Sequence, residues 1–299
     1  MDRGGIYRYC IGGQCVHIVV DAACCDLPAV LPSLAPFASD DAATAPMFVM
    51  TITTCEPPAC DWREIGDFDT GNGHTRVEKD DTTGDYRFLM RNIAEQPVAW
   101  MWTRQGFTHC YCKLLAITTV DATFALNTAL MMAYAFEGAH HDTLLIHASC
   151  ATIGDWAYAF IARSGTGKST HVANWLKHVP DATLLNDDNP VVRVIDGEVF
   201  VYGSPWSGKT PCYLNERKRL GAITRIERAP SNRIVREPVA AAFASLLPSC
   251  STMKWDKAIY DDLIKTITNV VASTGIYTMY CLPDREAAEI CSTTIAQCK

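Results

Sequence analysis

Short runs of alternating apolar and β-branched residues dominate the first part of the chain. Segments such as 14–20 and 47–54 are typical of short strands. The Asp-Asp-Thr-Thr-Gly-Asp sequence at 80–85 predicts a hairpin turn, and Gln-Gly at 105–106 predicts a second one. We therefore expect residues 1–120 to form a β-rich N-terminal region.

The pattern changes after this region. Apolar residues at helical spacing predict a linking helix over 121–138, capped by Asp121 and ended by Gly138. Strand-like runs over 143–153 and 156–162 follow, and then strands alternate with helices to the end of the chain. We expect residues 121–299, including the linking helix, to form an α/β domain.

Composition and charge argue against some classes of protein. The 299 residues include 48% hydrophobic and 20% charged residues, which is an ordinary globular balance. The net charge of −7 argues against nucleic-acid binding, and no apolar run approaches the roughly 20 residues of a membrane span. The first residues lack the layout of a secretion signal, so a cytoplasmic protein is expected.

Fourteen cysteines raise the question of disulfides or a metal site. Their spacings contain no paired C-x-x-C motifs, and several lie inside apolar runs such as 279–282. Cysteine in such a run behaves as a small core residue. We expect reduced, structural thiols.

The segment Phe-Ile-Ala-Arg-Ser-Gly-Thr-Gly-Lys-Ser-Thr at 160–170 carries the clearest chemistry. Glycines allow several backbone N–H groups to point at one anion, and a following helix adds the positive end of its dipole. Alanine at 162 breaks the strict G-x-x-x-x-G-K-[ST] pattern, although the extra Gly165 restores flexibility. A strand before the loop and a helix after it favour phosphate binding over a simple turn. The predicted phosphate ligands are Arg163, Ser164, Gly165, Thr166, Gly167, Lys168, Ser169 and Thr170.

A pair of carboxylates follows the next predicted strand. Asp187 and Asp188 stand in the sequence Asn-Asp-Asp-Asn-Pro, which is also a good composition for an ordinary turn. Together with the glycine-rich loop, the pair predicts a Mg²⁺ site, since Mg²⁺ takes one or two carboxylates plus phosphate oxygens.

These motifs resemble the HPr kinase/phosphorylase and phosphoenolpyruvate carboxykinase superfamily, and most of all its HPr-kinase-related bacterial branch. The resemblance covers about residues 143–195, on the segments Ile-His-Ala-Ser, Arg-Ser-Gly-Thr-Gly-Lys-Ser-Thr and Asn-Asp-Asp. It implies a P-loop kinase core of sheet and helices, with the β-rich region before it as a candidate acceptor- or partner-binding part. It also implies ATP and Mg²⁺ as cofactors, and homo-oligomers occur among such proteins.

The resemblance also assigns roles to residues. Lys168 would contact the β and γ phosphates, and Ser169 the metal. One carboxylate of the pair would be the catalytic base and the other a metal ligand; we assign Asp187 as base and Asp188 as ligand, although the reverse order is open. His147, expected in a strand, would face the γ phosphate or a second metal, against the alternative of a core histidine.

The acceptor is not identified by the sequence. Trp206 and Lys209, in Ser-Pro-Trp-Ser-Gly-Lys-Thr at 204–210, are candidate acceptor-binding residues, against the alternative of a tight turn with a buried tryptophan. This segment lacks the glutamate found in HPr kinases, which speaks against phosphorylation of HPr itself.

Three functions remain open. The chain is expected to be an ATP-dependent kinase acting on a hydroxyl of a peptide, carrier protein or small molecule. The alternatives are a non-catalytic nucleotide-binding regulatory module and a carboxykinase-like enzyme, for which the chain is short. The donor could equally be GTP or pyrophosphate.

Overall fold

A computed structural model gives the structure of the protein and describes residues 4–21, 24–115, 118–163, 165–208 and 210–296. The fold is mixed α/β with two separate sheets. The chain divides into two compact units, with the division between Gly138 and Ala139. We call them unit 1 and unit 2 and describe each by itself.

Unit 1 contains an eight-stranded sheet in the order β1-β2-β3-β8-β7-β6-β5-β4, in which β3 runs parallel to both of its neighbours. Both predicted hairpins are confirmed: one joins β5 to β6, and the other joins β7 to β8 through Gln105 and Gly106. Both turn residues have positive φ angles, of 59° and 68°. The elements of unit 1 are β1 (Gly5–Ile11), β2 (Gln14–Val20), α1 (Leu27–Val30), the 3₁₀ helix η1 (Pro32–Phe37), β3 (Phe48–Ile52), β4 (Trp62–Asp69), β5 (Gly73–Asp80), β6 (Tyr86–Asn92), β7 (Pro97–Arg104), β8 (His109–Leu114) and α2 (Thr119–Ala139).

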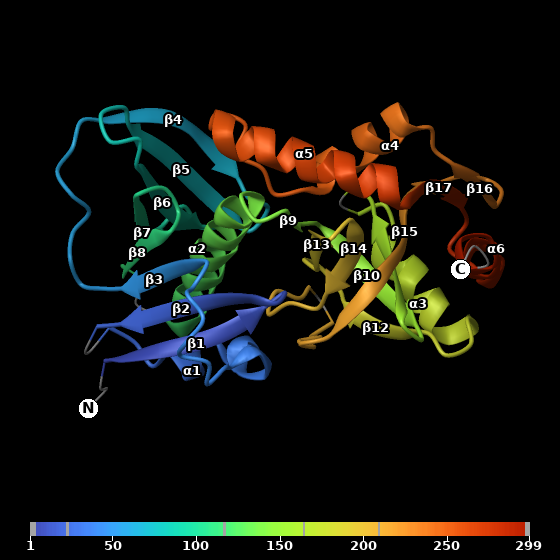
Figure 1. The fold of residues 1–299 in the computed structure, drawn as a ribbon, viewed down its shortest axis with the longest axis horizontal. Helices are drawn as coiled ribbons and strands as arrows, with labels where there is room; N and C mark the ends of the chain where they lie inside the picture. Colours follow the sequence, from blue (N-terminus) through green and yellow to red (C-terminus); the bar gives the residue numbers. More distant parts are fainter. Residues whose placement is uncertain (1–3, 22–23, 116–117, 164, 209, 297–299) are drawn as a thin grey trace. The chain divides into compact units, whose positions relative to one another are not determined.

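The predicted linking helix is confirmed as α2, but it begins at Thr119, so Asp121 lies in its first turn and is not its cap. The helix packs with unit 1 rather than with the α/β unit that follows. Tyr134 donates a hydrogen bond of 2.9 Å from its hydroxyl to the backbone oxygen of Ile11, and Phe136 packs edge-on against Phe107. Figure 1 shows α2 lying against the sheet of unit 1. The expected boundary before residue 121 therefore moves to the far end of this helix, because side chains of α2 such as Tyr134 and Phe136 pack within unit 1.

Unit 2 contains the second sheet, in which β12, β10, β11 and β15 are neighbours, and β15 also pairs with β14 and β17. Helices α3 and α6 contact each other and the strands β10, β11, β15 and β17, whereas α5 contacts β9, β13 and β14. The elements of unit 2 are β9 (Thr143–Leu145), β10 (Ala148–Ile153), β11 (Trp156–Ile161), α3 (Lys168–His178), β12 (Thr183–Asn186), β13 (Val191–Ile195), β14 (Glu198–Tyr202), β15 (Arg217–Arg228), β16 (Arg233–Arg236), α4 (Val239–Leu246), the 3₁₀ helix η2 (Leu247–Ser249), α5 (Lys257–Ser273), β17 (Gly275–Cys281) and α6 (Arg285–Ala296).

Helix α3 is fixed to the sheet by one large aromatic side chain. Trp175 is fully buried and packs against Tyr158 and Phe160 of β11, with ring centroids 5.4 and 5.0 Å apart. Truncation of a buried aromatic of this kind costs about 3–5 kcal/mol. Helix α3 is therefore packed directly against β11.

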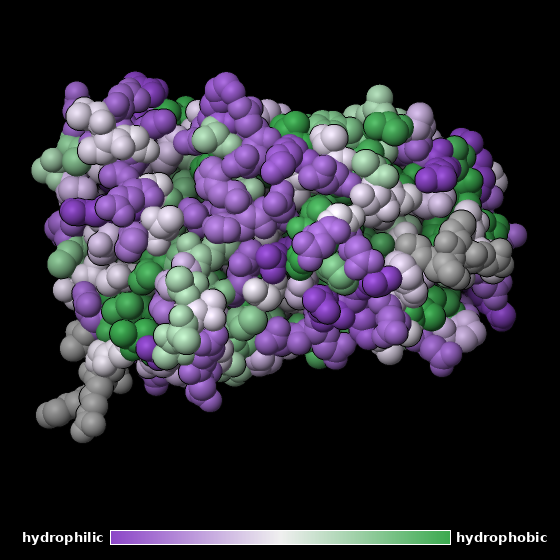
Figure 2. Space-filling view, in the orientation of Figure 1, coloured by the Kyte–Doolittle hydropathy of each residue, from purple (hydrophilic) through white to green (hydrophobic). Residues whose placement is uncertain are grey.

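Two general expectations can be compared with the structure. No helix among the described residues is long and apolar enough to cross a membrane. Every cysteine in the described ranges has a free thiol, and the fully buried thiols, such as Cys150 and Cys291, have raised pKa values because of burial. Hydrophilic residues predominate on the face shown in Figure 2, with smaller hydrophobic areas between them.

Candidate functional site

The glycine-rich loop (residues 162–167) connects the end of β11 to the first residue of α3. Gly165 and Gly167 have φ angles of 76° and 122°, in the region that favours glycine. Ala162, which replaces the first glycine of the usual pattern, does not share this conformation and packs partly buried against the core of unit 2. Alanine is tolerated there because the turn needs its backbone freedom only at the two later positions.

Lys168 is the first residue of α3, and its ammonium group is unusual. The Nζ atom is buried, and no described residue forms a hydrogen bond with it. Burial lowers the pKa of Lys168, while the nearby carboxylates of Asp188 and Asp187 act to raise it. A buried ammonium without a hydrogen-bond partner is unfavourable by itself, and the two nearby carboxylates offset part of that cost.

Of the other predicted phosphate ligands, those that the structure describes lie in the loop before Lys168 and in the first turn of α3 after it. Ser169 and Thr170 are exposed in the first turn of α3. The N–H of Thr166 donates to the backbone oxygen of Arg163 at 3.1 Å, which closes a tight turn in the loop. Arg163 is exposed, and Ser164 lies outside the described residues. The loop thus presents its polar groups at the N-terminus of a helix, where the dipole favours an anion.

The sheet topology brings the carboxylate pair to the same edge as this loop. Strands β11 and β12 both run antiparallel to β10, which lies between them, so their C-terminal ends meet the same edge. Ile161 at the end of β11 lies opposite Ala148, and Asn186 at the end of β12 lies opposite Cys150. Strands two apart in a sheet are separated by about 10 Å. The residues after β12 therefore lie beside the glycine-rich loop.

Asp187 is almost fully buried, with 7% of its surface exposed. Its Oδ1 accepts a hydrogen bond of 2.9 Å from the Ser149 hydroxyl, and its Oδ2 accepts one of 3.2 Å from the backbone N–H of Thr210. Both carboxylate oxygens are thus bound by other groups of the fold, and the buried side chain has little access to an acceptor. The hydrogen bonding thus disfavours the expected role of Asp187 as base.

Asp188 is the accessible member of the pair, with 32% of its side chain exposed. Its Oδ1 lies 3.2 Å from Nδ1 of His147, whose side chain is 49% exposed, and its Oδ2 accepts from the Asn189 side chain at 2.8 Å. His147 therefore lies beside the carboxylate pair and is not a core histidine. Its position differs from the expected strand: β9 ends before it and β10 begins after it, and its N–H donates to Ser249 at 2.7 Å.

Asn186 organises this region, although the sequence analysis did not single it out. Its side-chain oxygen accepts from the backbone N–H groups of Asp188 and Asn189, both at 2.9 Å. Its amide donates to the Ser204 hydroxyl at 3.1 Å and to the backbone oxygen of Trp206 at 3.2 Å. Asn186 is fully buried, so one side chain fixes both the turn that carries the carboxylates and the segment after β14.

This segment does not match the expected acceptor-binding role for Trp206. The Trp206 side chain is buried, with 4% exposed, and its backbone is tied to Asn186 and Ser204. The alternative of a turn around a buried tryptophan therefore describes it better. Lys209, the other candidate, lies outside the described residues.

Arg228, at the end of β15, also contacts the glycine-rich loop and was not predicted. Its Nε donates to the backbone oxygen of Thr166 at 2.8 Å, and its Nη2 donates to that of Gly165 at 2.6 Å. Arginines after the loop are numerous in the sequence, so nothing in the pattern distinguishes this one.

The donors at the site fit Mg²⁺ only together with a phosphate. No group of three or more His, Cys, Asp or Glu side chains that could hold a metal occurs in the described part of the chain. The exposed Ser169 hydroxyl and the carboxylates are nevertheless the oxygen donors that Mg²⁺ prefers, and Mg²⁺ usually keeps waters and phosphate oxygens as further ligands.

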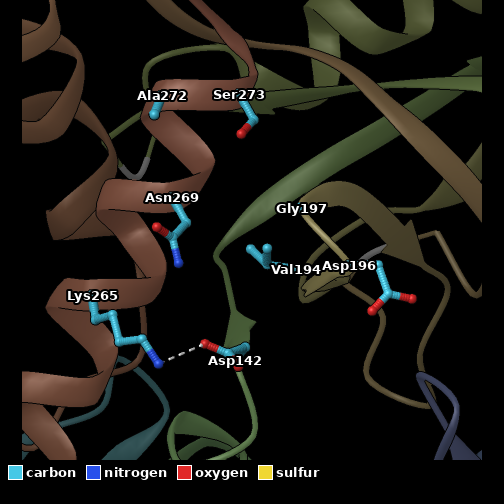
Figure 3. A pocket seen from close by; sticks show the side chains of 8 residues that line it. All are labelled: Asp142, Val194, Asp196, Gly197, Lys265, Asn269, Ala272 and Ser273. Atoms are coloured by element: carbon cyan, nitrogen blue, oxygen red, sulfur yellow. Dashed lines mark ion pairs between the residues drawn. The ribbon is translucent and has the colours of Figure 1, made fainter.

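A separate hollow of about 320 Å³ lies between α5 and the β13–β14 hairpin. Lys265 and Asp142 form an ion pair of 3.5 Å at its edge, as Figure 3 shows. None of its lining residues belongs to the predicted site. We assign it no role.

We expect Asn186→Ala to lower the free energy of unfolding by about 2–4 kcal/mol, because several buried hydrogen bonds lose a partner at once. Denaturant unfolding measures the change. Asn174→Ala, on α3 and outside this network, is the control and is expected to change the free energy of unfolding by less than about 0.5 kcal/mol. Equal effects of the two variants would contradict the organising role of Asn186.

Comparisons with known proteins add no identification. A scan of the chain against models of protein families gives no match, and a search of curated proteins gives no match either.

Proposed function

We propose that unit 2 is a kinase domain that binds Mg-ATP and transfers the γ-phosphoryl group to a hydroxyl of an acceptor. One observation carries the proposal: the buried Nζ of Lys168, which has no described hydrogen-bond partner, lies at the N-terminus of α3 next to two glycines in left-handed conformations. This combination suits the phosphates of a nucleotide, which would supply the missing partner for the cation.

The carboxylates favour catalysis over simple binding. The arrangement suits Asp188 as the base that accepts the proton of the acceptor hydroxyl, because Asp188 is accessible and pairs with His147. His147 would orient that carboxylate. Asp187, fixed by Ser149 and Thr210, would act with Ser169 on the metal side. This reverses the order assigned from sequence.

Phosphoryl transfer needs positioning and neutralisation of charge more than covalent chemistry. When bound, Mg²⁺ would neutralise phosphate charge and orient the phosphate oxygens. Lys168 would hold the β and γ phosphates, and the helix N-terminus would stabilise the charge that develops on them. The superfamily resemblance described above agrees with these roles.

The regulatory-module alternative retains some support. The close fixation of Asp187 by two hydrogen bonds is also what a purely structural carboxylate would have. A module of this kind would bind Mg-ATP without transferring phosphate, and unit 1 would then be the part that contacts a partner. The carboxykinase-like alternative has no observation in its favour.

Calorimetry with Mg-ATP tests the proposal directly. We expect saturable, Mg²⁺-dependent binding of one nucleotide by the wild-type protein, and transfer of labelled phosphate to a component of a cell extract. Parallel titrations with Mg-GTP and pyrophosphate identify the preferred donor. Absence of binding to all three would refute the nucleotide site, and binding without transfer would favour the regulatory module.

A further inference from the structure

We propose that Arg228 is a positioning residue that holds the glycine-rich loop in its anion-binding conformation. The inference rests on the proposed function for its effect on nucleotide affinity, but its effect on the loop itself can be measured without any nucleotide. Arg228 lies about 60 residues beyond the loop in sequence and reaches it only through the fold.

The contact joins one guanidinium to two successive peptide groups. Nε and Nη2 of Arg228 donate to the backbone oxygens of Thr166 and Gly165 at 2.8 and 2.6 Å. Among the described residues, no carboxylate forms an ion pair with Arg228. The planar fork of an arginine matches two neighbouring acceptors in a way that the single ammonium of a lysine does not.

Because a peptide group is planar, this contact also fixes the direction of the N–H groups on the opposite side of the loop. The C=O and N–H of a trans peptide point in opposite directions. When Arg228 holds the oxygen of Thr166, the N–H of Gly167 in the same peptide group must face away from the guanidinium. Gly167 directly precedes α3, so this N–H joins those at the helix N-terminus.

The loop needs such a restraint because its own glycines provide none. Gly165 and Gly167 gain conformational freedom from the absence of a Cβ atom, and this freedom opposes a single bound conformation. A restraint already present before ligand binding reduces the ordering cost at the moment of binding. Arg228 supplies it from a rigid base, since the last residues of β15 pair with β17 in parallel register up to Arg228 itself.

Limited proteolysis tests the effect on the loop. Trypsin cleavage after Arg163, an exposed residue of the loop, can be followed by mass spectrometry in the absence of nucleotide. We expect Arg228→Met to be cleaved at this bond at least about 10-fold faster than wild type, because charge-assisted hydrogen bonds are lost. Thermal unfolding shows whether the variant remains folded.

Calorimetry with Mg-ATP tests the consequence for binding. We expect Arg228→Met to weaken Mg-ATP affinity by about 10-fold or more. Arg228→Lys keeps the charge but not the fork, so it should recover only part of the affinity and part of the protection. Arg219→Met is the matched control: Arg219 lies on the same strand, pairs with Glu198 at 3.0 Å, and should behave as wild type in both assays.

The outcomes separate the two proposals. Unchanged cleavage after Arg163 in Arg228→Met would overturn the positioning role, whatever the nucleotide data show. Full recovery of affinity and protection in Arg228→Lys would also overturn it, because charge alone would then explain the effect. A wild-type protein that binds no nucleotide would refute the proposed function, while faster cleavage in Arg228→Met would still support the positioning of the loop.

Discussion

Lys168→Met is expected to weaken Mg-ATP binding by at least about 100-fold while leaving the folded protein at least as stable as wild type. We expect the loss of affinity because a positively charged side chain that is held in place and shielded from water interacts strongly with the negative charge of a phosphate. The free energy of unfolding should stay the same or rise, because methionine removes a buried ammonium that has no described hydrogen-bond partner. Calorimetry and denaturant unfolding measure the two effects.

The difference in stability between Lys168→Met and wild type should depend on pH in a direction that can be stated in advance. Burial lowers the pKa of Lys168 in the folded state, so the unfolded state binds more protons between the lowered pKa and the ordinary lysine pKa. The cost of the buried charge is therefore fully present below the lowered pKa and is relieved as pH rises through this window. The advantage of Lys168→Met over wild type should shrink at high pH.

A lysine at the other end of the same helix provides the control. Lys177 is exposed in the last turn of α3, and Lys177→Met should leave Mg-ATP affinity unchanged. If Lys168→Met and Lys177→Met bind Mg-ATP equally well, Lys168 is not a phosphate ligand. If Lys168→Met instead unfolds, the ammonium has a stabilising partner that the described residues do not include.

Asp188→Asn is expected to lower phosphoryl transfer by about 10²–10⁴-fold with only a small change in Mg-ATP affinity. Asparagine keeps the shape and can still contact His147 and Asn189, but it cannot accept the proton of the acceptor hydroxyl. Turnover with a cell-extract acceptor, or slow hydrolysis with water as acceptor, provides the rate, and calorimetry provides the affinity.

Two further variants show whether the effect is specific to Asp188. Asp187→Ala should lower both affinity and the free energy of unfolding, the latter by about 2–3 kcal/mol, because Ser149 and the Thr210 amide lose a charged partner. Asp181→Asn, in the exposed turn after α3, is the control for a change of charge. A parallel fall of affinity and rate in Asp188→Asn would show that Asp188 acts on the metal, as the sequence first suggested.

The loop and its helix could be predicted because their chemistry is local. Gly165, Gly167 and Lys168 stand close together in sequence, and the predicted order of strand, loop and helix agrees with β11 and α3. The carboxylate pair was also found, since it directly follows an apolar run that forms β12. Residues that are close in sequence are also close in the structure, so a short sequence pattern is enough to recognise such a motif.

Other parts of the site depend on contacts between distant segments. Asn186 and Arg228 act through bonds to residues 18–20 and about 60 positions away, and no short-range pattern marks such partners. The break between β9 and β10 at His147 was missed for a similar reason. The apolar run is continuous in sequence, but β9 pairs with β13 and β10 with β11 and β12, so the run divides between different partners.

The choice between the two carboxylates shows the same limit. Adjacent aspartates are equivalent in composition, and only the partners contributed by Ser149, Thr210 and His147 distinguish them. The Trp206 backbone likewise accepts a hydrogen bond from Asn186, a residue 20 positions away in sequence.

The parts of unit 2 differ in how strongly they resist local unfolding, and the long strand β15 is among the most resistant. β15 bonds first to β14 and then to β11 and β17 on its two sides, so its amide groups can exchange with solvent only when several strands separate together. By contrast, the described part of the glycine-rich loop is closed by a turn, with a backbone hydrogen bond from the Thr166 N–H to the Arg163 oxygen. The strand that ends in Arg228 therefore stays closed when other parts of unit 2 open locally, and it keeps the guanidinium beside the backbone oxygens of Gly165 and Thr166.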